Sequence, residues 1–195
     1  MLKERLKNYN IILASGSPRR QHFFKELDID FTIEVREVEE SYPSNLEGPE
    51  ITDYLAQLKA SMFTELSEKD IVVTSDTIVW MNNEAINKPK DFNEARQMLE
   101  HLSGSVHEVI TSVCFTGADF QKTINDTTRV WFRELTEAEI EYYLTTYHPY
   151  DKAGSYGVQE WIGYVGIDRL EGSYFNVMGL PTRLVYKTLM ELGRP

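Results

Sequence analysis

The stretch Leu13-Ala14-Ser15-Gly16-Ser17-Pro18-Arg19-Arg20 predicts a strand that turns directly into a helix. The apolar run from Ile11 to Ala14 is typical of a buried strand. Ser17 is a favourable N-cap residue, and Pro18 suits the first helical position. A helix start attracts anions through its free N–H groups and its dipole, and two guanidinium groups follow immediately here. The stretch therefore predicts a phosphate site, although an ordinary turn with two solvated arginines has the same residue types.

The composition is that of an ordinary globular protein, with 195 residues, 42% of them hydrophobic and 26% charged. The net charge of −11 argues against a surface for duplex nucleic acid, but a local basic pocket can still bind a small anion. No stretch approaches the roughly 20 apolar residues of a membrane span. The first ten residues are charged and lack the apolar core of a signal peptide. We therefore expect a cytoplasmic protein that binds neither a membrane nor a nucleic-acid polymer.

Strand and helix patterns alternate along the whole chain, which predicts a mixed α/β protein without a linker or an internal repeat. Thr136 and Glu139 form a capping box at the start of one helix, and Pro181 is expected to open the last helix. Asn82-Asn83 predicts a hairpin turn. The helices are expected at 18–27, 51–66, 92–102, 137–147 and after Pro181. The strands are expected at 11–14, 31–38, 70–81, 106–116, 123–132 and 162–170.

Asp76 is an unexpected carboxylate between two strongly apolar β runs. Burying it costs stability unless it is paired, hydrogen-bonded or bound to a metal, so Asp76 is the leading catalytic candidate. The alternative is a structural turn residue. Two lysines accompany it: Lys59 borders the apolar stripe of a predicted helix, and Lys88 follows the predicted hairpin. Either lysine alone would be interpreted as a surface residue.

Two further segments are candidates for ligand contact. Glu39 and Glu40 follow a predicted strand and offer the oxygen donors that a hard cation such as Mg²⁺ prefers, although solvated acids at a strand end are equally common. The segment from Asp151 to Gln159 places two glycines around small polar residues, which suits backbone that passes close to a ligand. A tight surface loop is the alternative.

Common catalytic and nucleotide-binding motifs are absent from the sequence. It has no Walker A motif, no Gly-x-Gly-x-x-Gly fingerprint and no Gly-x-Ser-x-Gly elbow, and its histidines and single cysteine lack metal-ligand spacing. What remains is a set of basic residues, carboxylates and small-residue turns. Phosphoryl chemistry uses this combination, because cations spread the negative charge and a carboxylate positions or deprotonates water.

The order of these motifs resembles that of the Maf-like nucleoside triphosphate pyrophosphatases. The resemblance covers nearly the whole chain, so we expect a single domain over residues 1–195. The motifs that carry it are Leu13–Arg20, Glu37-Val38-Glu39-Glu40, Lys59-Ala60, Ser75-Asp76-Thr77, Lys88-Pro89, Leu102-Ser103-Gly104 with His107, Asp151–Gln159, and Gly172-Ser173-Tyr174 with Asn176-Val177 and Gly179-Leu180-Pro181.

This resemblance implies an elongated mixed sheet flanked by helices, with two lobes around a cleft, similar to inosine triphosphate pyrophosphatases. It implies cleavage between the α- and β-phosphates, which yields a nucleoside monophosphate and pyrophosphate. Asp76 matches the family's proton acceptor. Arg19, Thr77 and Gln159 match the positions that select the base, and their identities resemble the dTTP/UTP branch rather than the 7-methyl-GTP branch. Ser75 replaces a common alanine, and a homodimer is a plausible assembly.

The resulting hypothesis assigns a role to each residue. Mg²⁺ or Mn²⁺ would be held by Glu40, with Glu39 or Asp76, and Asp76 would activate the attacking water. Gln159 can read the imide edge of uracil or thymine through one amide donor and one acceptor. The expected phosphate-binding residues are Ser15, Ser17, Arg20, Lys59 and Lys88, together with Arg19 at the helix start.

Two alternatives remain open at this point. One is a pyrophosphatase of the same architecture that acts on 7-methyl-GTP, inosine triphosphate or a modified nucleotide. The other is a non-catalytic nucleotide-binding regulator of cell division, which the family's historical name suggests. A buried carboxylate beside a phosphate site argues against the regulator, because binding alone does not need one.

Overall fold

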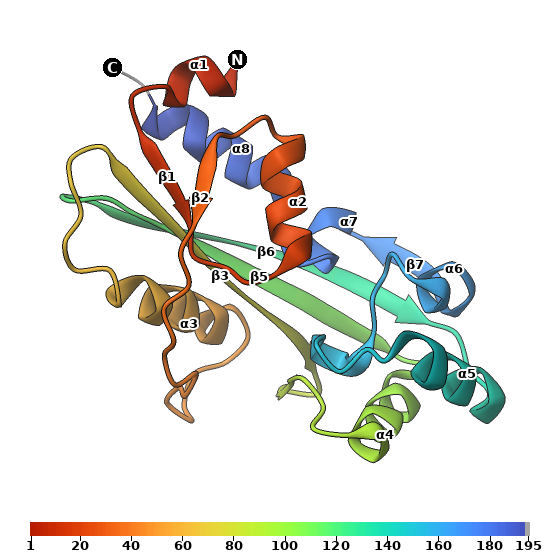
Figure 1. Ribbon diagram of the computed structural model, residues 1–195. Coiled ribbons are helices and arrows are strands. Elements are labelled where there is room, and N and C mark those ends of the chain that lie inside the picture. The colour runs from red at the N-terminus through yellow and green to blue at the C-terminus, as the bar shows by residue number, and fades with distance from the viewer. Residues whose placement is uncertain (194–195) are drawn as a thin grey trace. The chain divides into compact units, whose positions relative to one another are not determined.

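The computed structural model describes residues 1–193 and shows a mixed α/β fold (Figure 1). The strands are β1 (Asn10–Leu13), β2 (Phe31–Ile33), β3 (Asp70–Met81), β4 (Glu84–Ile86), β5 (Val106–Thr116), β6 (Gln121–Phe132) and β7 (Ile167–Glu171). The helices are α1 (Leu2–Leu6), α2 (Pro18–Glu26), α3 (Pro49–Ser61), α4 (Phe92–Leu102), α5 (Glu137–Tyr147), α6 (Trp161–Gly166), α7 (Tyr174–Val177) and α8 (Thr182–Leu192), with a short 3-10 helix η1 (Ala153–Ser155).

The sheet is mixed, as the family resemblance implies. Its strands follow the order β2-β1-β3-β5-β6-β7, and β4 pairs with β3. β1 runs parallel to both β2 and β3, whereas β4 is antiparallel to β3 and β7 is antiparallel to β6. Within residues 1–193, each helix is too short or too polar to cross a bilayer.

The chain divides into two compact units, in agreement with the expectation of two lobes. Unit 1 comprises residues 1–76, 111–126 and the chain from Gly179 onward, and unit 2 comprises residues 77–110 and 127–178. The boundary between Asp76 and Thr77 therefore falls inside β3.

Unit 1 contains the strand that precedes the predicted phosphate site. Figure 1 shows α3 on one face of its strands and α2 and α8 on the other. Helix α3 is attached to β3 by the Thr74 hydroxyl, which donates to the Ala56 carbonyl at 2.6 Å. Ala56 and Ala60 pack with Cys114, and all three side chains are buried. These small residues let α3 lie close to the sheet.

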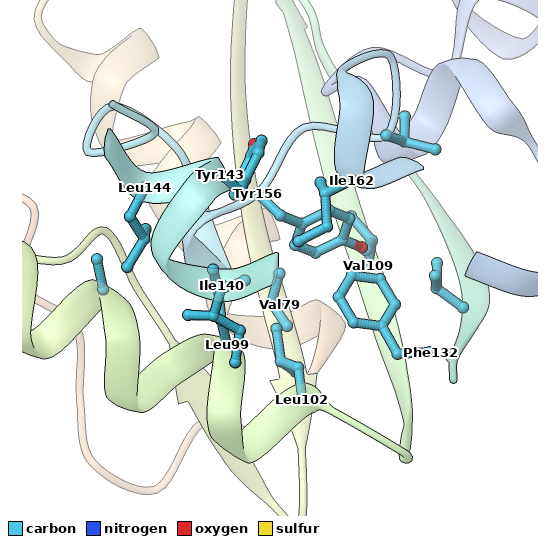
Figure 2. Packing of buried hydrophobic residues seen from close by; sticks show 13 residues of the cluster. Val79, Leu99, Leu102, Val109, Phe132, Ile140, Tyr143, Leu144, Tyr156 and Ile162 are labelled. Carbon is cyan, nitrogen blue, oxygen red and sulfur yellow. The ribbon is translucent and has the colours of Figure 1, made fainter. Parts of the chain in front are cut away.

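Unit 2 is built around an aromatic-rich core (Figure 2). Side chains from α4 and α5 pack over residues of β3, β5 and β6, as the apolar stripes of both helices predict. The buried members are Val79, Ala95, Leu99, Leu102, Val109, Val130, Phe132, Ile140, Tyr143, Leu144, Tyr156, Val158 and Ile162. Strand and helix positions in this unit therefore share one hydrophobic core.

Most predicted elements are confirmed, but two strands and one helix differ. The strand expected at 31–38 ends at Ile33, because its partner β1 ends at Leu13 and offers nothing further to pair with. The segment 162–170 begins as α6 and becomes strand only at Ile167, where pairing with β6 starts. The helix expected to reach 66 ends at Ser61.

Candidate active site

The strand–turn–helix of residues 13–20, which we call the Ser15 turn, forms as predicted. Ser17 is the N-cap of α2, and its hydroxyl accepts from the Arg20 N–H at 3.5 Å. The Ser15 hydroxyl accepts from the Ser17 N–H at 3.2 Å. The Gln21 amide donates to the Ser15 carbonyl, also at 3.2 Å. Short-range hydrogen bonds therefore fix the turn.

Gly16 leaves open space at this turn. A Cβ built on Gly16 would meet no atom of its surroundings within 4 Å, and Gly16 is not among the positive-φ glycines. Neither a close packing contact nor a left-handed backbone therefore accounts for a glycine here. The open space lies beside the start of α2, where an anion can approach backbone N–H groups.

The parallel register of β1 and β3 brings a second segment to the same end of unit 1. Leu13 lies opposite Val73, so the chain beyond each residue leaves the strand pair at that end. The half-buried Arg20 guanidinium joins the two segments, because its Nη1 donates to the Ser75 carbonyl at 2.9 Å. Its Nε donates to the Gly179 carbonyl, also at 2.9 Å.

Charges around Arg20 act in opposite directions on its pKa. Desolvation lowers the pKa of Arg20 below its ordinary value, and the neighbouring Arg19 adds to this effect. Asp76 and Glu40 raise it. A guanidinium nevertheless stays charged in a protein. Arg20 is thus a fixed positive group close to both carboxylates.

Lys59 connects the two predicted carboxylates. Its Nζ donates to Asp76 Oδ1 at 2.6 Å and lies 3.1 Å from Glu40 Oε1. The Asp76 side chain is only 9% exposed, whereas that of Glu40 is 51% exposed. The ion pair with Lys59 offsets the desolvation of Asp76, as the position of this carboxylate between two apolar runs requires.

The carboxylates fit part of the donor set of a divalent cation. Glu40 and Asp76 converge on Lys59, with Arg20 close to both, so their oxygen atoms lie in one region and can act together as ligands. Glu39 is exposed. No cluster of three acidic, histidine or cysteine side chains suitable for a metal occurs among residues 1–193. Mg²⁺ is commonly bound by one or two carboxylates plus substrate phosphates, so two protein ligands are chemically sufficient.

The remaining predicted site residues belong to unit 2. Thr77 is the first residue of this unit and lies in β3. Lys88 is exposed after β4, and Gln159 is partly exposed in the segment 151–160, which we call the Gln159 loop. The Gly154 N–H donates to the Asn87 carbonyl at 3.2 Å, so the Gln159 loop is attached to the chain next to Lys88.

Three residues that support the Gln159 loop were not assigned a role in the sequence analysis. Lys152 Nζ lies 3.1 Å from Glu160 Oε1, and the two side chains are only 10% and 18% exposed. The Tyr143 hydroxyl donates to Glu160 Oε2 and accepts from the Gly157 N–H. The sequence signal that could have identified two of them is the pair of opposite charges, Lys152 and Glu160, at the two ends of a glycine-containing segment.

A parallel strand pair thus carries a capped helix start, two arginines and a buried carboxylate to one end of unit 1, which defines an α/β protein with a candidate anion-binding site. The family profile described as "Maf-like protein" matches residues 10–192. The chain therefore belongs to the Maf-like family.

Similar proteins extend over almost the whole chain. A protein of Christiangramia forsetii named dTTP/UTP pyrophosphatase is 58% identical over 193 residues, covering 98% of each chain. Proteins of the same name from Flavobacterium psychrophilum and Flavobacterium johnsoniae are 56% and 55% identical, covering 97% and 98% of this chain and 98% and 100% of theirs. A solved structure titled "The structure of the Staphylococcus aureus Ham1 protein" matches with a TM-score of 0.47 and 16% identity, covering 63% of this chain and 71% of that chain.

Proposed function

We propose that this chain hydrolyses nucleoside triphosphates, preferring dTTP and UTP, to a nucleoside monophosphate and pyrophosphate. The observation that carries the proposal is the buried Asp76 carboxylate, paired with Lys59 and close to Arg20. The names of relatives that are 55–58% identical over nearly the whole chain support the substrate class. The net charge of −11 favours free nucleotides over a nucleic-acid polymer as substrates.

The Ser15 turn is suited to hold the triphosphate. The start of α2 offers backbone N–H groups and the positive end of its dipole, and Gly16 leaves room beside them. Arg19 and Arg20 add positive charge at the same helix start. We assign Lys59 and Lys88 to the neutralisation of charge that develops on the leaving pyrophosphate.

Asp76 is suited to activate the attacking water. In the proposed reaction, a water oxygen bonds to the α-phosphorus while the bond from that phosphorus to the α–β bridging oxygen breaks. Asp76 accepts the proton of the water, and pyrophosphate leaves. Lys59 fixes the carboxylate through Oδ1, so the water does not have to orient a mobile side chain.

A divalent cation completes the proposed site. Glu40 and Asp76 would hold Mg²⁺ or Mn²⁺ with substrate phosphate oxygens, and Glu39 is the weaker candidate because it is exposed. When bound, the metal would polarise phosphate oxygens and spread their negative charge.

Base selection is assigned mainly to unit 2, through Gln159 and Thr77. The Gln159 amide has one donor group and one acceptor, which match the O4 carbonyl and the N3–H of uracil and thymine. Arg19 and Thr77 are the other proposed selectors, from the family motifs that they match. Gln159→Glu removes the donor, so turnover of UTP should fall, whereas Gln97→Glu on the exposed face of α4 is the matched control.

A product assay tests the whole proposal. The purified protein is incubated with Mg²⁺ or Mn²⁺ and, separately, with dTTP, UTP, CTP, ITP, GTP and 7-methyl-GTP, and monophosphate is resolved from diphosphate. We expect monophosphate and pyrophosphate from dTTP and UTP. Turnover of a purine nucleotide alone would contradict the base assignment. Binding of nucleotide without any product would contradict the reaction and support a regulator.

A further inference from the structure

The turn that carries Gln159 is closed by its own backbone and by neighbouring side chains. The Glu160 N–H donates to the Gly157 carbonyl at 2.9 Å, so Gln159 lies inside a tight turn. A Cβ built on Gly157 would lie 2.9 Å from Gln159 Nε2 and 2.8 Å from Glu160 Cδ. The Gln159 amide is therefore folded over Gly157, beside the Glu160 carboxylate.

Tyr143 holds this turn at both ends. Its hydroxyl accepts from the Gly157 N–H at 3.0 Å and donates to the Glu160 carboxylate. The ring is fully buried on α5 and belongs to the same core cluster as Tyr156 of the Gln159 loop (Figure 2). Burial and the neighbouring Glu160 raise the pKa of Tyr143 above its ordinary value, so the hydroxyl keeps its proton. One side chain thus bonds to the first and last residues of the turn.

Lys152 compensates the negative charge of the largely buried Glu160 carboxylate. Its Nζ lies 3.1 Å from Glu160 Oε1 and donates to Asp151 Oδ1 at 2.7 Å. Glu160 is therefore held by a different partner at each oxygen, Tyr143 at one and Lys152 at the other. A buried ion pair is weak evidence for stability, because apolar residues of similar volume often serve equally well. Its position next to Gln159 indicates a role in orientation.

We propose that Tyr143, Glu160 and Lys152 are positioning residues that orient the Gln159 amide for recognition of the pyrimidine imide. This inference rests on the proposed function, in which Gln159 reads the base. In this proposal, the three residues contact neither the base nor the phosphates. They act through Gln159, so they should affect the choice between uracil and cytosine more than the cleavage step. Cytosine is the informative competitor, because it carries an amino group at C4 and lacks the N3–H.

Tyr143→Phe is the main test, because it removes only the hydroxyl and keeps the ring in the core. The ratio of kcat/KM for UTP to that for CTP is measured, together with kcat and the thermal unfolding midpoint. We expect the ratio to fall about tenfold, mainly through KM for UTP, while kcat stays within about twofold. Tyr142→Phe, a 48% exposed neighbour on the same helix, is the matched control and should keep the wild-type ratio.

A double-mutant cycle of Tyr143→Phe and Gln159→Ala separates the positioning role of Tyr143 from the base-reading role of Gln159. If Gln159→Ala leaves the UTP/CTP ratio unchanged, the assignment of Gln159 as base reader is wrong. If Gln159→Ala lowers the ratio but Tyr143→Phe does not, the positioning role is wrong and the base reader stands. In the Gln159→Ala background, Tyr143→Phe should have no further effect on the ratio.

Gly157→Ala is a second variant that removes no hydrogen-bonding group. Its Cβ must displace Gln159 Nε2 or the Glu160 carboxylate, so it should lower the UTP/CTP ratio in the same way. This variant decides the question if Tyr143→Phe does not fold. A wild-type ratio in Gly157→Ala, or an equal loss of kcat for UTP and CTP in Tyr143→Phe, would overturn the proposal.

Discussion

The Ser15 turn and the Gln159 loop both use glycine and small polar residues, yet different interactions hold them in place. Ser15 and Ser17 make hydrogen bonds to residues two to six positions away. The Gln159 loop depends on Tyr143, which is 14 residues from its partner Gly157, and on the buried pair of Lys152 and Glu160. Local hydrogen bonds therefore determine the backbone of the first segment, where only the Arg20 side chain reaches remote carbonyls, whereas the second segment also needs the Tyr143 hydroxyl from α5.

The largest expected effect tests the chemistry assigned to unit 1. Asp76→Asn should lower kcat for dTTP by about 10²–10⁴-fold, the usual range for a general base. The amide should still bind dTTP, which calorimetry can measure without turnover. Asp70→Asn, an acid-to-amide change at the start of the same strand, is the control. Near-normal turnover in Asp76→Asn would eliminate this residue as the base.

The next effect concerns the stability of the Gln159 loop. Lys152→Met leaves Glu160 without its cation in a largely buried position, so the free energy of unfolding should fall by about 3 kcal/mol. Lys187→Met removes an exposed lysine 4.0 Å from Glu191 and should cost less than about 0.5 kcal/mol. Denaturant titration of both variants measures the difference. Equal values would mean that the pair of Lys152 and Glu160 does not stabilise the Gln159 loop more than an exposed ion pair would.

Gly16→Ala tests whether the open space at the Ser15 turn serves substrate binding rather than stability. The added methyl group has space in the protein, so the thermal midpoint should not change. The same methyl group occupies the space where a phosphate would approach the backbone, so KM for dTTP should rise about tenfold, equivalent to roughly 1.4 kcal/mol. An unchanged KM would show that the substrate does not use this space.

His107 provides an effect of another kind, through the pH dependence of stability. Its Nε2 lies 2.7 Å from the Tyr156 hydroxyl, and burial lowers the pKa of His107 from 6.5 to about 3. In the unfolded chain, His107 therefore binds a proton below about pH 6.5. In the native protein, the same side chain stays neutral until about pH 3. Stability is lost as the pH falls, by up to about 1.4 kcal/mol per pH unit.

His107→Gln should remove this contribution, so its free energy of unfolding should depend less steeply on pH between 6 and 4, measured by denaturant titration at each pH. A slope equal to that of the wild-type protein would mean that His107 does not resist protonation in the native state.

The elements that could be predicted from sequence are those that neighbouring residues determine. Ser17 and Thr136 act as N-caps, and Asn82 and Asn83 adopt the positive φ of the predicted hairpin turn. The two strand predictions that were wrong depend on pairing strands that are remote in sequence. The strand predicted at 31–38 stops because β1 ends, and the segment 162–166 is helical although its residues favour strand.

The same distinction holds for the site. Asp76 could be identified because a carboxylate between apolar runs is locally anomalous, and the structure places it beside Lys59. The role of the Tyr143 hydroxyl could not be predicted, because from sequence an inward-facing tyrosine on an amphipathic helix is indistinguishable from an ordinary core residue. The convergence of Glu40 and Asp76 on one lysine also depends on tertiary structure.

The division of β3 between two units has a consequence for how such an enzyme could diverge. A single peptide bond, between Asp76 and Thr77, separates the group assigned to bond cleavage from a group assigned to base choice. Gln159 and its supports also lie in unit 2, whereas Lys59, Glu40 and Asp76 lie in unit 1 together with the third proposed selector, Arg19. Mutation of Thr77, Gln159 or its supports can therefore shift the preferred nucleotide over evolutionary time while the inherited carboxylates and Lys59 remain intact.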